Sequence, residues 1–159
     1  MAFSSLLLNL AMCVWVTAIW VSGCSYKCGN QQLSVEELSS KGSPACQEAF
    51  TYLRDQLKAE KNVVESVEYE PLKEMEAPSY NVRETPRVRA FFGDKLELFL
   101  FIPEKSVNQI KNDLTIPEGL RAWVDRAQLG GMSRLLRVQL GSRQDVEVLM
   151  PLMKAIVRQ

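Results

Sequence analysis

The chain has 159 residues, 19 of them basic and 19 acidic, so its formal net charge is zero, and it contains no histidine. A balanced charge does not favour nucleic acid as the partner of the whole molecule. The sequence also lacks a GxSxG motif, a glycine-rich phosphate loop and a cluster of metal ligands, so most general-base, triad and metal mechanisms lack the residues they need. We therefore expect a protein that is not an enzyme and that takes no metal, cofactor or small-molecule substrate.

An apolar run from Leu6 to Cys24 opens the chain, and the first charged side chain in the sequence is Lys27. Such a run is either a secretory signal that is removed or a helix that stays in the bilayer. It closes on Val21-Ser22-Gly23-Cys24, which resembles the lipobox of bacterial lipoproteins, where a branched apolar residue and two small residues precede an acylated cysteine. The resemblance covers about the first 24 residues. It implies a signal peptide over residues 1–23 and lipidation of Cys24, which becomes the new N-terminus.

The number of cysteines gives a second expectation. Cys13 lies inside the apolar run, so if Cys24 carries lipid, Cys28 and Cys46 remain as a pair. In an oxidising compartment a disulfide between them would close a loop of 19 residues (46 − 28 + 1) and stabilise the fold by roughly 3 kcal/mol. The alternative is that Cys28 belongs to a flexible tether and that Cys46 is a small buried hydrophobe on a helix.

The stretch 24–42 is polar and rich in glycine, asparagine and glutamine, which is typical of a tether between a membrane and a domain. Within it, a short helix over 35–40 is an alternative. Residues 43–159 are then expected to form a single domain that is large enough to bury a core.

The first helix of this domain is predicted over residues 44–60. Ser43 favours a helix start as N-cap, and Pro44 suits the first helical position because its missing amide hydrogen has no intrahelical partner there. Apolar residues then recur at helical spacing, as expected for a helix packed on a sheet: Cys46, Phe50, Leu53 and Leu57. Valines and a tyrosine alternating with polar residues predict a strand over 63–70.

The middle of the chain predicts a β-hairpin. Residues 71–86 contain three prolines and are expected to be an irregular connection, with an edge strand near 80–83. Residues 87–102 are apolar on both sides of Gly93-Asp94. A three-residue loop over 93–95 is favoured, because it pairs Ala90 with Leu98 and Val88 with Leu100 and so gives one wholly apolar face.

The other face of this hairpin combines aromatic and basic side chains, which are the usual anchors of protein interfaces. It predicts an interaction surface made of Arg87, Arg89, Phe91, Phe99 and Phe101, with Glu97 among them. The alternative is that a helix or the proline-containing segment covers this face, with the arginines reaching out at its border.

The last third of the chain adds helices and one strand. A helix is expected over 104–113, and a second over 120–128, where alternation also fits a strand. Residues 134–140 alternate as a strand, and 143–157 form a closing helix that Pro151 should kink or split. The fold class is thus α+β: a two-layer sandwich with a mostly antiparallel sheet of three or four strands and helices on one face, behind the N-terminal apolar segment.

Charge is unevenly divided within the neutral total. Residues 24–86 hold 7 basic and 11 acidic residues (7 − 11 = −4), and residues 87–159 hold 12 and 8 (12 − 8 = +4). This division fits a solvated surface with local pairing of acids and bases, and the alternative is an arginine-rich face for an acidic partner or for lipid headgroups. The lipobox favours a small lipid-anchored envelope protein that binds or assembles other envelope proteins, on the cell membrane or outer membrane and facing the periplasm or the exterior.

Two alternatives stay open for this function. One is a single-pass protein whose uncleaved helix holds the domain on the cytoplasmic side, where its basic half would meet anionic lipid or an acidic protein. The other is a secreted soluble binding protein.

Overall fold

The computed structural model describes residues 32–159, so the predictions for the signal segment, for lipidation and for residues 24–31 lie outside it. These residues form one six-stranded sheet in the order β1-β2-β3-β4-β6-β5, in which all neighbouring strands are antiparallel. The strands are β1 (Val63–Glu70), β2 (Met75–Val82), β3 (Thr85–Phe91), β4 (Leu96–Pro103), β5 (Gln128–Gly130) and β6 (Ser133–Leu140).

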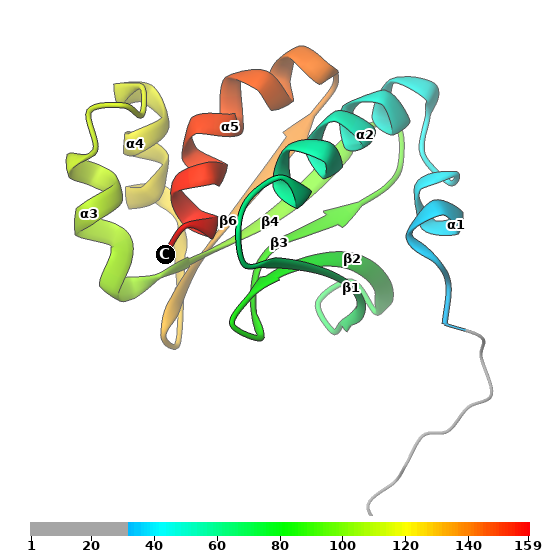
Figure 1. The fold of residues 1–159 in the computed structure, drawn as a ribbon, viewed down its shortest axis with the longest axis horizontal. Coiled ribbons are helices and arrows are strands. Elements are labelled where there is room, and N and C mark those ends of the chain that lie inside the picture. The colour runs from blue at the N-terminus through cyan, green and yellow to red at the C-terminus, as the bar shows by residue number, and fades with distance from the viewer. Residues whose placement is uncertain (1–31) are drawn as a thin grey trace, which may run out of the picture. The chain divides into compact units, whose positions relative to one another are not determined.

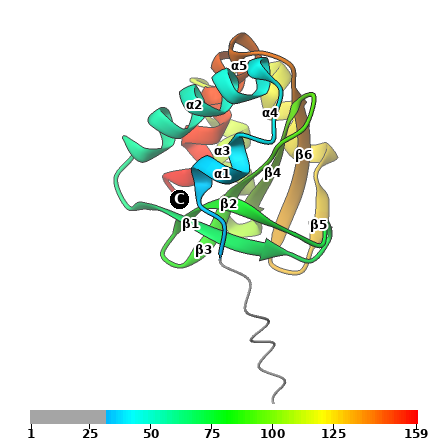
Figure 2. The same cartoon turned by 90° about the vertical axis from the view of Figure 1, so that its right-hand side faces the viewer.

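Helices cover one face of this sheet (Figures 1 and 2). They are α2 (Pro44–Lys58), α3 (Val107–Asn112), α4 (Glu118–Arg126) and α5 (Arg143–Val157), with a 3-10 turn at Glu104–Ser106 before α3. The α+β class and the single helical layer are confirmed. Among the helices of residues 32–159, none has the length and apolar character needed to cross a bilayer.

The helix ends follow the predicted chemistry. The Ser43 hydroxyl accepts a hydrogen bond from the amide of Cys46 at 3.2 Å, and Ser142 and Asp145 form a capping box at the start of α5. The α5 helix continues through Pro151 to Val157, so the expected division into two helices is wrong. Its core residues on both sides of the proline are buried, and this packing holds the helix together.

The core lies between the helices and the sheet. On β4 its side chains Leu96, Leu98, Leu100 and Ile102 are fully buried. The predicted hairpin register is confirmed, because Val88 pairs with Leu100 and Ala90 with Leu98. Since side chains alternate along a strand, this register sends Val88, Ala90 and the four buried side chains of β4 toward the helices.

The sheet is larger than expected because the short strand β5 was not predicted and because the residues of β2 were predicted as an irregular connection with only an edge strand near 80–83. Pro78 argues against an inner strand, since proline cannot donate to the ladder. In the structure, the pairing with β3 begins only at Ser79, one residue later. The sequence also gives no turn signal for the hairpin from β2 to β3. Its two loop residues, Arg83 and Glu84, have positive φ values of 50° and 63°, a conformation for which Asn-Gly is the usual sequence.

The domain also begins earlier than expected. A short helix, α1 (Val35–Ser39), packs beside β2 through the buried side chains of Val35 and Leu38, and Ser34 with Glu37 forms its capping box. Just before it, the side-chain amide of Gln32 donates to the carbonyl of Val67 on β1 at 2.8 Å. The predicted tether is therefore wrong for residues 32–42, because two apolar side chains three positions apart give this segment a face to bury.

Candidate functional site

Four of the five predicted interaction residues lie together on the face of the sheet opposite the helices, which we call the open face: Arg89, Phe91, Phe99 and Phe101. Phe91 and Phe99 are nevertheless buried there, with 4% and 0% of their surface exposed, while Phe101 is half-buried. The rings of Phe91 and Phe99 are 4.7 Å apart between centroids. The residues are thus close together, but two of the three rings are not at the surface.

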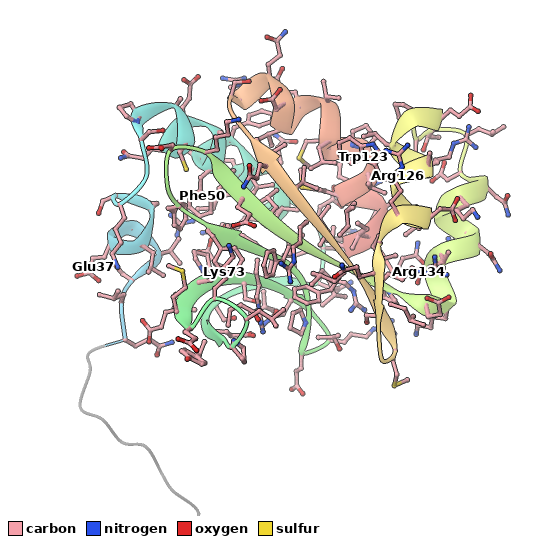
Figure 3. All side chains as sticks on the ribbon, turned by 180° about the vertical axis from the view of Figure 1, so that it is seen from behind. Glu37, Phe50, Lys73, Trp123, Arg126 and Arg134 are labelled. Atoms are coloured by element: carbon pink, nitrogen blue, oxygen red, sulfur yellow. The ribbon has the colours of Figure 1, made fainter. Side chains whose placement is uncertain are left out.

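Cationic side chains cover these rings. Lys73, in the turn between β1 and β2, places its Nζ 5.8 Å from the centroids of both Phe91 and Phe99 and 2.6 Å from a carboxylate oxygen of Glu97. Figure 3 views the molecule from behind and shows Lys73 over the central strands. Arg137 of β6 stands over Phe99, with its guanidinium carbon 4.9 Å from the ring centroid. The proline-containing segment therefore contributes to the cover, and a role of the rings in binding stays a prediction.

Arg89 belongs to an ion-pair network on the open face. Its guanidinium donates to Glu68 at 2.8 Å and also pairs with Glu70, which is only 3% exposed. It further stands 5.4 Å from the centroid of Phe101. Because the guanidinium neutralises a buried carboxylate, the main role of Arg89 in this structure is to hold β1 to β3 across β2.

Neutral polar groups complete this network. The amide of Asn81 donates to Ser66 at 3.0 Å and to Glu68, and the Ser79 hydroxyl donates to the Asn81 oxygen at 2.7 Å. Burial raises the pKa of Glu68, but hydrogen bonds from Asn81, Ser66 and Arg89 together outweigh it, so this pKa lies below its ordinary value.

Arg87 differs from Arg89, because its guanidinium has no carboxylate partner in the described part of the chain. It is 6% exposed and lies where the register between β2 and β3 shifts. Its one hydrogen bond, to the carbonyl of Pro86, is long at 3.4 Å, and burial lowers the pKa of the side chain. It is a buried residue and is not part of an exposed surface.

A second polar cluster lies on the helix side of the sheet. Arg54 of α2 makes a two-pronged contact with Glu65 of β1, at 2.7 and 2.8 Å, and the Tyr80 hydroxyl donates to the same carboxylate at 3.0 Å. Burial raises the pKa of Glu65, yet the hydrogen bonds from Arg54 and Tyr80 bring it below its ordinary value. Burial beside this carboxylate also raises the pKa of Tyr80. The cluster ties α2 to the sheet.

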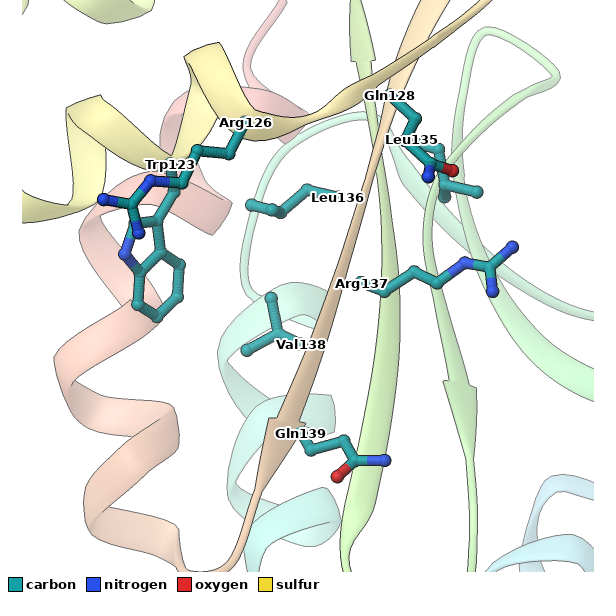
Figure 4. Close-up of a pocket in the computed structure, with 8 residues that line it drawn as sticks. All are labelled: Trp123, Arg126, Gln128, Leu135, Leu136, Arg137, Val138 and Gln139. Atoms are coloured by element: carbon teal, nitrogen blue, oxygen red, sulfur yellow. The ribbon is translucent and has the colours of Figure 1, made fainter.

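A hollow of about 530 Å³ lies at the other end of the sheet, between α4 and β6. Trp123, Arg126 and Gln128 line one side of it, and residues 135–139 line the other (Figure 4). We call it the α4 groove. Trp123 is half-buried against the core, and Arg126 is exposed.

The strand that borders this groove has one unpaired side. The short strand β5 pairs with β6 only at residues 133–135, whereas β4 pairs along the whole of β6. In the described residues, Leu136 to Leu140 therefore have a neighbouring strand on one side only, and we call the other side the β6 edge. Because backbone groups alternate in direction along an antiparallel strand, every second residue of this edge presents its N–H and C=O outward.

Side chains of the β6 edge point to two different environments. Figure 4 shows Leu136 and Val138 on the side of Trp123 and Arg126, whereas Arg137 and Gln139 point to the opposite side, toward the open face. The sequence predicted this alternation along β6, but it did not predict that the strand borders a groove. The strand order that makes Trp123 a groove residue has no signal in a single sequence.

Cys46 is the predicted site residue on α2, and its thiol is fully buried. Burial raises the pKa of this thiol, which agrees with the role of a small hydrophobe. Its predicted partner Cys28, and Cys24, lie outside the described residues, so the disulfide and the lipidation stay predictions. Within residues 32–159 no group of three or more potential ligands is placed to hold a metal ion.

Comparison with known proteins adds no family to this description. No protein-family model matches the sequence, and comparison with curated proteins and with solved structures gives no match. The function is therefore inferred from the β6 edge and the α4 groove.

Proposed function

We propose that this protein is a binding module that takes up an extended segment of another protein along the β6 edge, beside the α4 groove. The observation that supports this is the unpaired side of Leu136 to Leu140 next to a hollow lined by Trp123. An extended peptide added to such an edge gains main-chain hydrogen bonds from the strand, and its alternate side chains enter the neighbouring pocket.

The contrast between the two edges of the sheet favours this proposal. Exposed strand edges are usually protected against pairing by charges, prolines or covering segments. The β1 edge has three glutamates, at 65, 68 and 70, and its Val67 carbonyl already accepts the Gln32 amide. Residues 136–140, by contrast, carry one charge, on Arg137, and no proline. The β6 edge is the less protected of the two.

The test uses synthetic peptides, because the partner is not identified. A random library of nine-residue peptides is panned against the full chain, and the best binder is then made with N-methyl groups on one or the other alternate set of its amides. Methylation of one set should weaken binding at least about tenfold and methylation of the other set should have little effect, since a strand donates to an edge through alternate amides. No enriched peptide, or equal effects of the two patterns, would contradict strand addition.

The groove is tested in the same assay with two truncations. Trp123→Ala should weaken peptide binding about tenfold, because it removes the largest apolar side chain of the hollow. Val148→Ala is the control, since it also removes an apolar side chain, but one that is exposed on α5 outside the groove. The proposed location is wrong if both variants bind like the unchanged protein.

We also propose that the chain is held at a membrane through Cys24, as in the lipoproteins whose lipobox it resembles. The apolar run and the tetrad before Cys24 support this. Mass spectrometry of the membrane-extracted protein should find a chain that begins at Cys24 with added acyl mass, and a loss of two hydrogens across Cys28 and Cys46 that reduction restores. A full-length chain with both thiols reduced would instead indicate an uncleaved anchor, and an unmodified chain released from the membrane a secreted protein.

A further inference from the structure

The charged side chains that line the α4 groove are all positive. The groove is lined by two arginines and two glutamines, and no acidic residue occurs among its described lining residues. Arg126 projects from the last turn of α4, and Arg137 from the middle of the β6 edge. The strand edge is therefore bordered by positive charge, although the whole chain has no net charge.

These two arginines also differ from their neighbours in having no ion pair with a described residue. Arg134, three positions before Arg137 on β6, makes a two-pronged contact with Glu104 at 2.8 Å. Arg137 contacts an aromatic ring instead, and its guanidinium carbon is 4.9 Å from the centroid of Phe99. A guanidinium held over a ring keeps its donors free, so Arg137 is placed to receive a carboxylate with little loss of side-chain freedom.

From this arrangement we infer that the partner segment is a strand of about five residues that alternates apolar and acidic side chains. The inference rests on the proposed strand addition at the β6 edge. In a strand beside residues 136–140, one set of side chains faces Trp123, Leu136 and Val138, which are apolar. The other set faces Arg137 and Gln139, where a directly opposite carboxylate forms a favourable cross-strand pair.

A second copy of the same chain fits this edge less well. Pairing two β6 edges would bring Arg126 and Arg137 of both copies into one interface without an acidic residue of the groove to neutralise them. Like charges brought together in this way oppose association. Charge complementarity thus favours an acidic strand from a different protein.

The experiment uses Trp123 as a reporter in the groove. The chain has three tryptophans, and Trp15→Phe with Trp20→Phe leaves Trp123 as the only one in the full-length protein. Three peptides share the same alternating valines and carry glutamate, glutamine or lysine at the positions between them. Titration of Trp123 fluorescence in neutral detergent then gives the affinity of each peptide.

The glutamate peptide should bind at least about tenfold more tightly than the lysine peptide, with the glutamine peptide between them. Arg137→Glu should reverse this order. Lys105→Glu is the matched control, because Lys105 is exposed, has no ion pair with a described residue and lies outside the groove, and it should leave the order unchanged. Arg126→Glu reverses a charge on the other side of the edge, where Arg126 lies beside Trp123 and the apolar side chains of the partner are expected, so it should change the order less than Arg137→Glu.

The outcomes separate this inference from the proposed function. Equal affinities of the three peptides, or an order unaffected by Arg137→Glu, would overturn the acidic partner while leaving strand addition in place. If library peptides bind but none of the three does, the alternating pattern is wrong. If no peptide binds at all, strand addition itself is wrong. Light scattering that finds a dimer broken by Arg126→Glu or Arg137→Glu would point to a second copy at this edge.

Discussion

Replacing Arg89 with alanine is expected to destabilise the domain by about 3–5 kcal/mol, which is the usual cost of removing one partner from a buried ion pair. The guanidinium pairs with Glu68 and Glu70, and Glu70 is almost completely buried. Without Arg89 that carboxylate stays buried without its cationic partner, which is unfavourable. Urea unfolding of the variant and the unchanged protein measures the difference.

The control for this experiment is Lys111→Ala, which removes an exposed ion pair with Asp125. Exposed pairs contribute at most about 1 kcal/mol, so this variant should unfold close to the unchanged protein. A loss below about 1 kcal/mol for Arg89→Ala would show that the network does not stabilise the fold. Arg89 would then be available for the binding role that the sequence predicted for it.

Replacing Glu65 with glutamine is expected to cost about 2 kcal/mol at neutral pH, because hydrogen bonds from a charged guanidinium are stronger than those between neutral groups. Glutamine keeps an oxygen that can accept from Tyr80, but it loses the charge and one of the two oxygens that Arg54 contacts. Arg54 keeps its contact with Glu36, so it is not left without any partner.

The effect of Glu65→Gln should also depend on pH. The pKa of Glu65 is lower in the folded protein than its ordinary value of about 4.3, so its contribution to stability is fully present above that pH. As pH falls through the folded pKa, the carboxylate takes up a proton and the contribution is lost. Urea unfolding from about pH 7 down to about pH 3 should therefore show the two proteins converging in stability. A difference in unfolding free energy that stays constant over this pH range would show that the ionised Glu65 carboxylate is not the source of the stabilisation.

The control for the pH series is Glu48→Gln, because Glu48 is exposed on α2 and has no ion pair with a described residue. Its unfolding free energy should follow that of the unchanged protein at every pH. If the stability difference between Glu48→Gln and the unchanged protein also shrank at low pH, the pH dependence seen for Glu65→Gln would reflect acid unfolding in general.

The elements that the sequence predicted well are those with strong local patterns. The strand over 63–70, the hairpin register around Gly93 and the start of α2 at Pro44 depend on alternation, helical spacing and capping, and all three are confirmed. Only the end of β2 was predicted, as an edge strand near 80–83, because Pro78 and a turn without glycine or asparagine hide the rest of this inner strand. The helix α1 was predicted only as an alternative to the tether, because its packing on β2 is what distinguishes it from a polar segment.

The candidate site was only partly predictable for a similar reason. Alternation placed Arg89 and three phenylalanines on one face, where the structure also has them, but Lys73 covers two of the rings from a segment that the sequence predicted as irregular. The β6 edge depends on strand order and on β5 being only three residues long. Both are properties of the tertiary structure, and neither leaves a pattern in the residues themselves.

The hydrogen bond from Gln32 to Val67 fixes the start of the domain at the opposite side of the sheet from the β6 edge. Four strand spacings separate β1 from β6, which is roughly 19 Å at about 4.8 Å each. The sheet therefore acts as a rigid spacer between the point where the chain enters the domain and the point where a partner would bind. The proposed anchor at Cys24 precedes the β1 side of the sheet in the chain, whereas the proposed partner would bind at the β6 side.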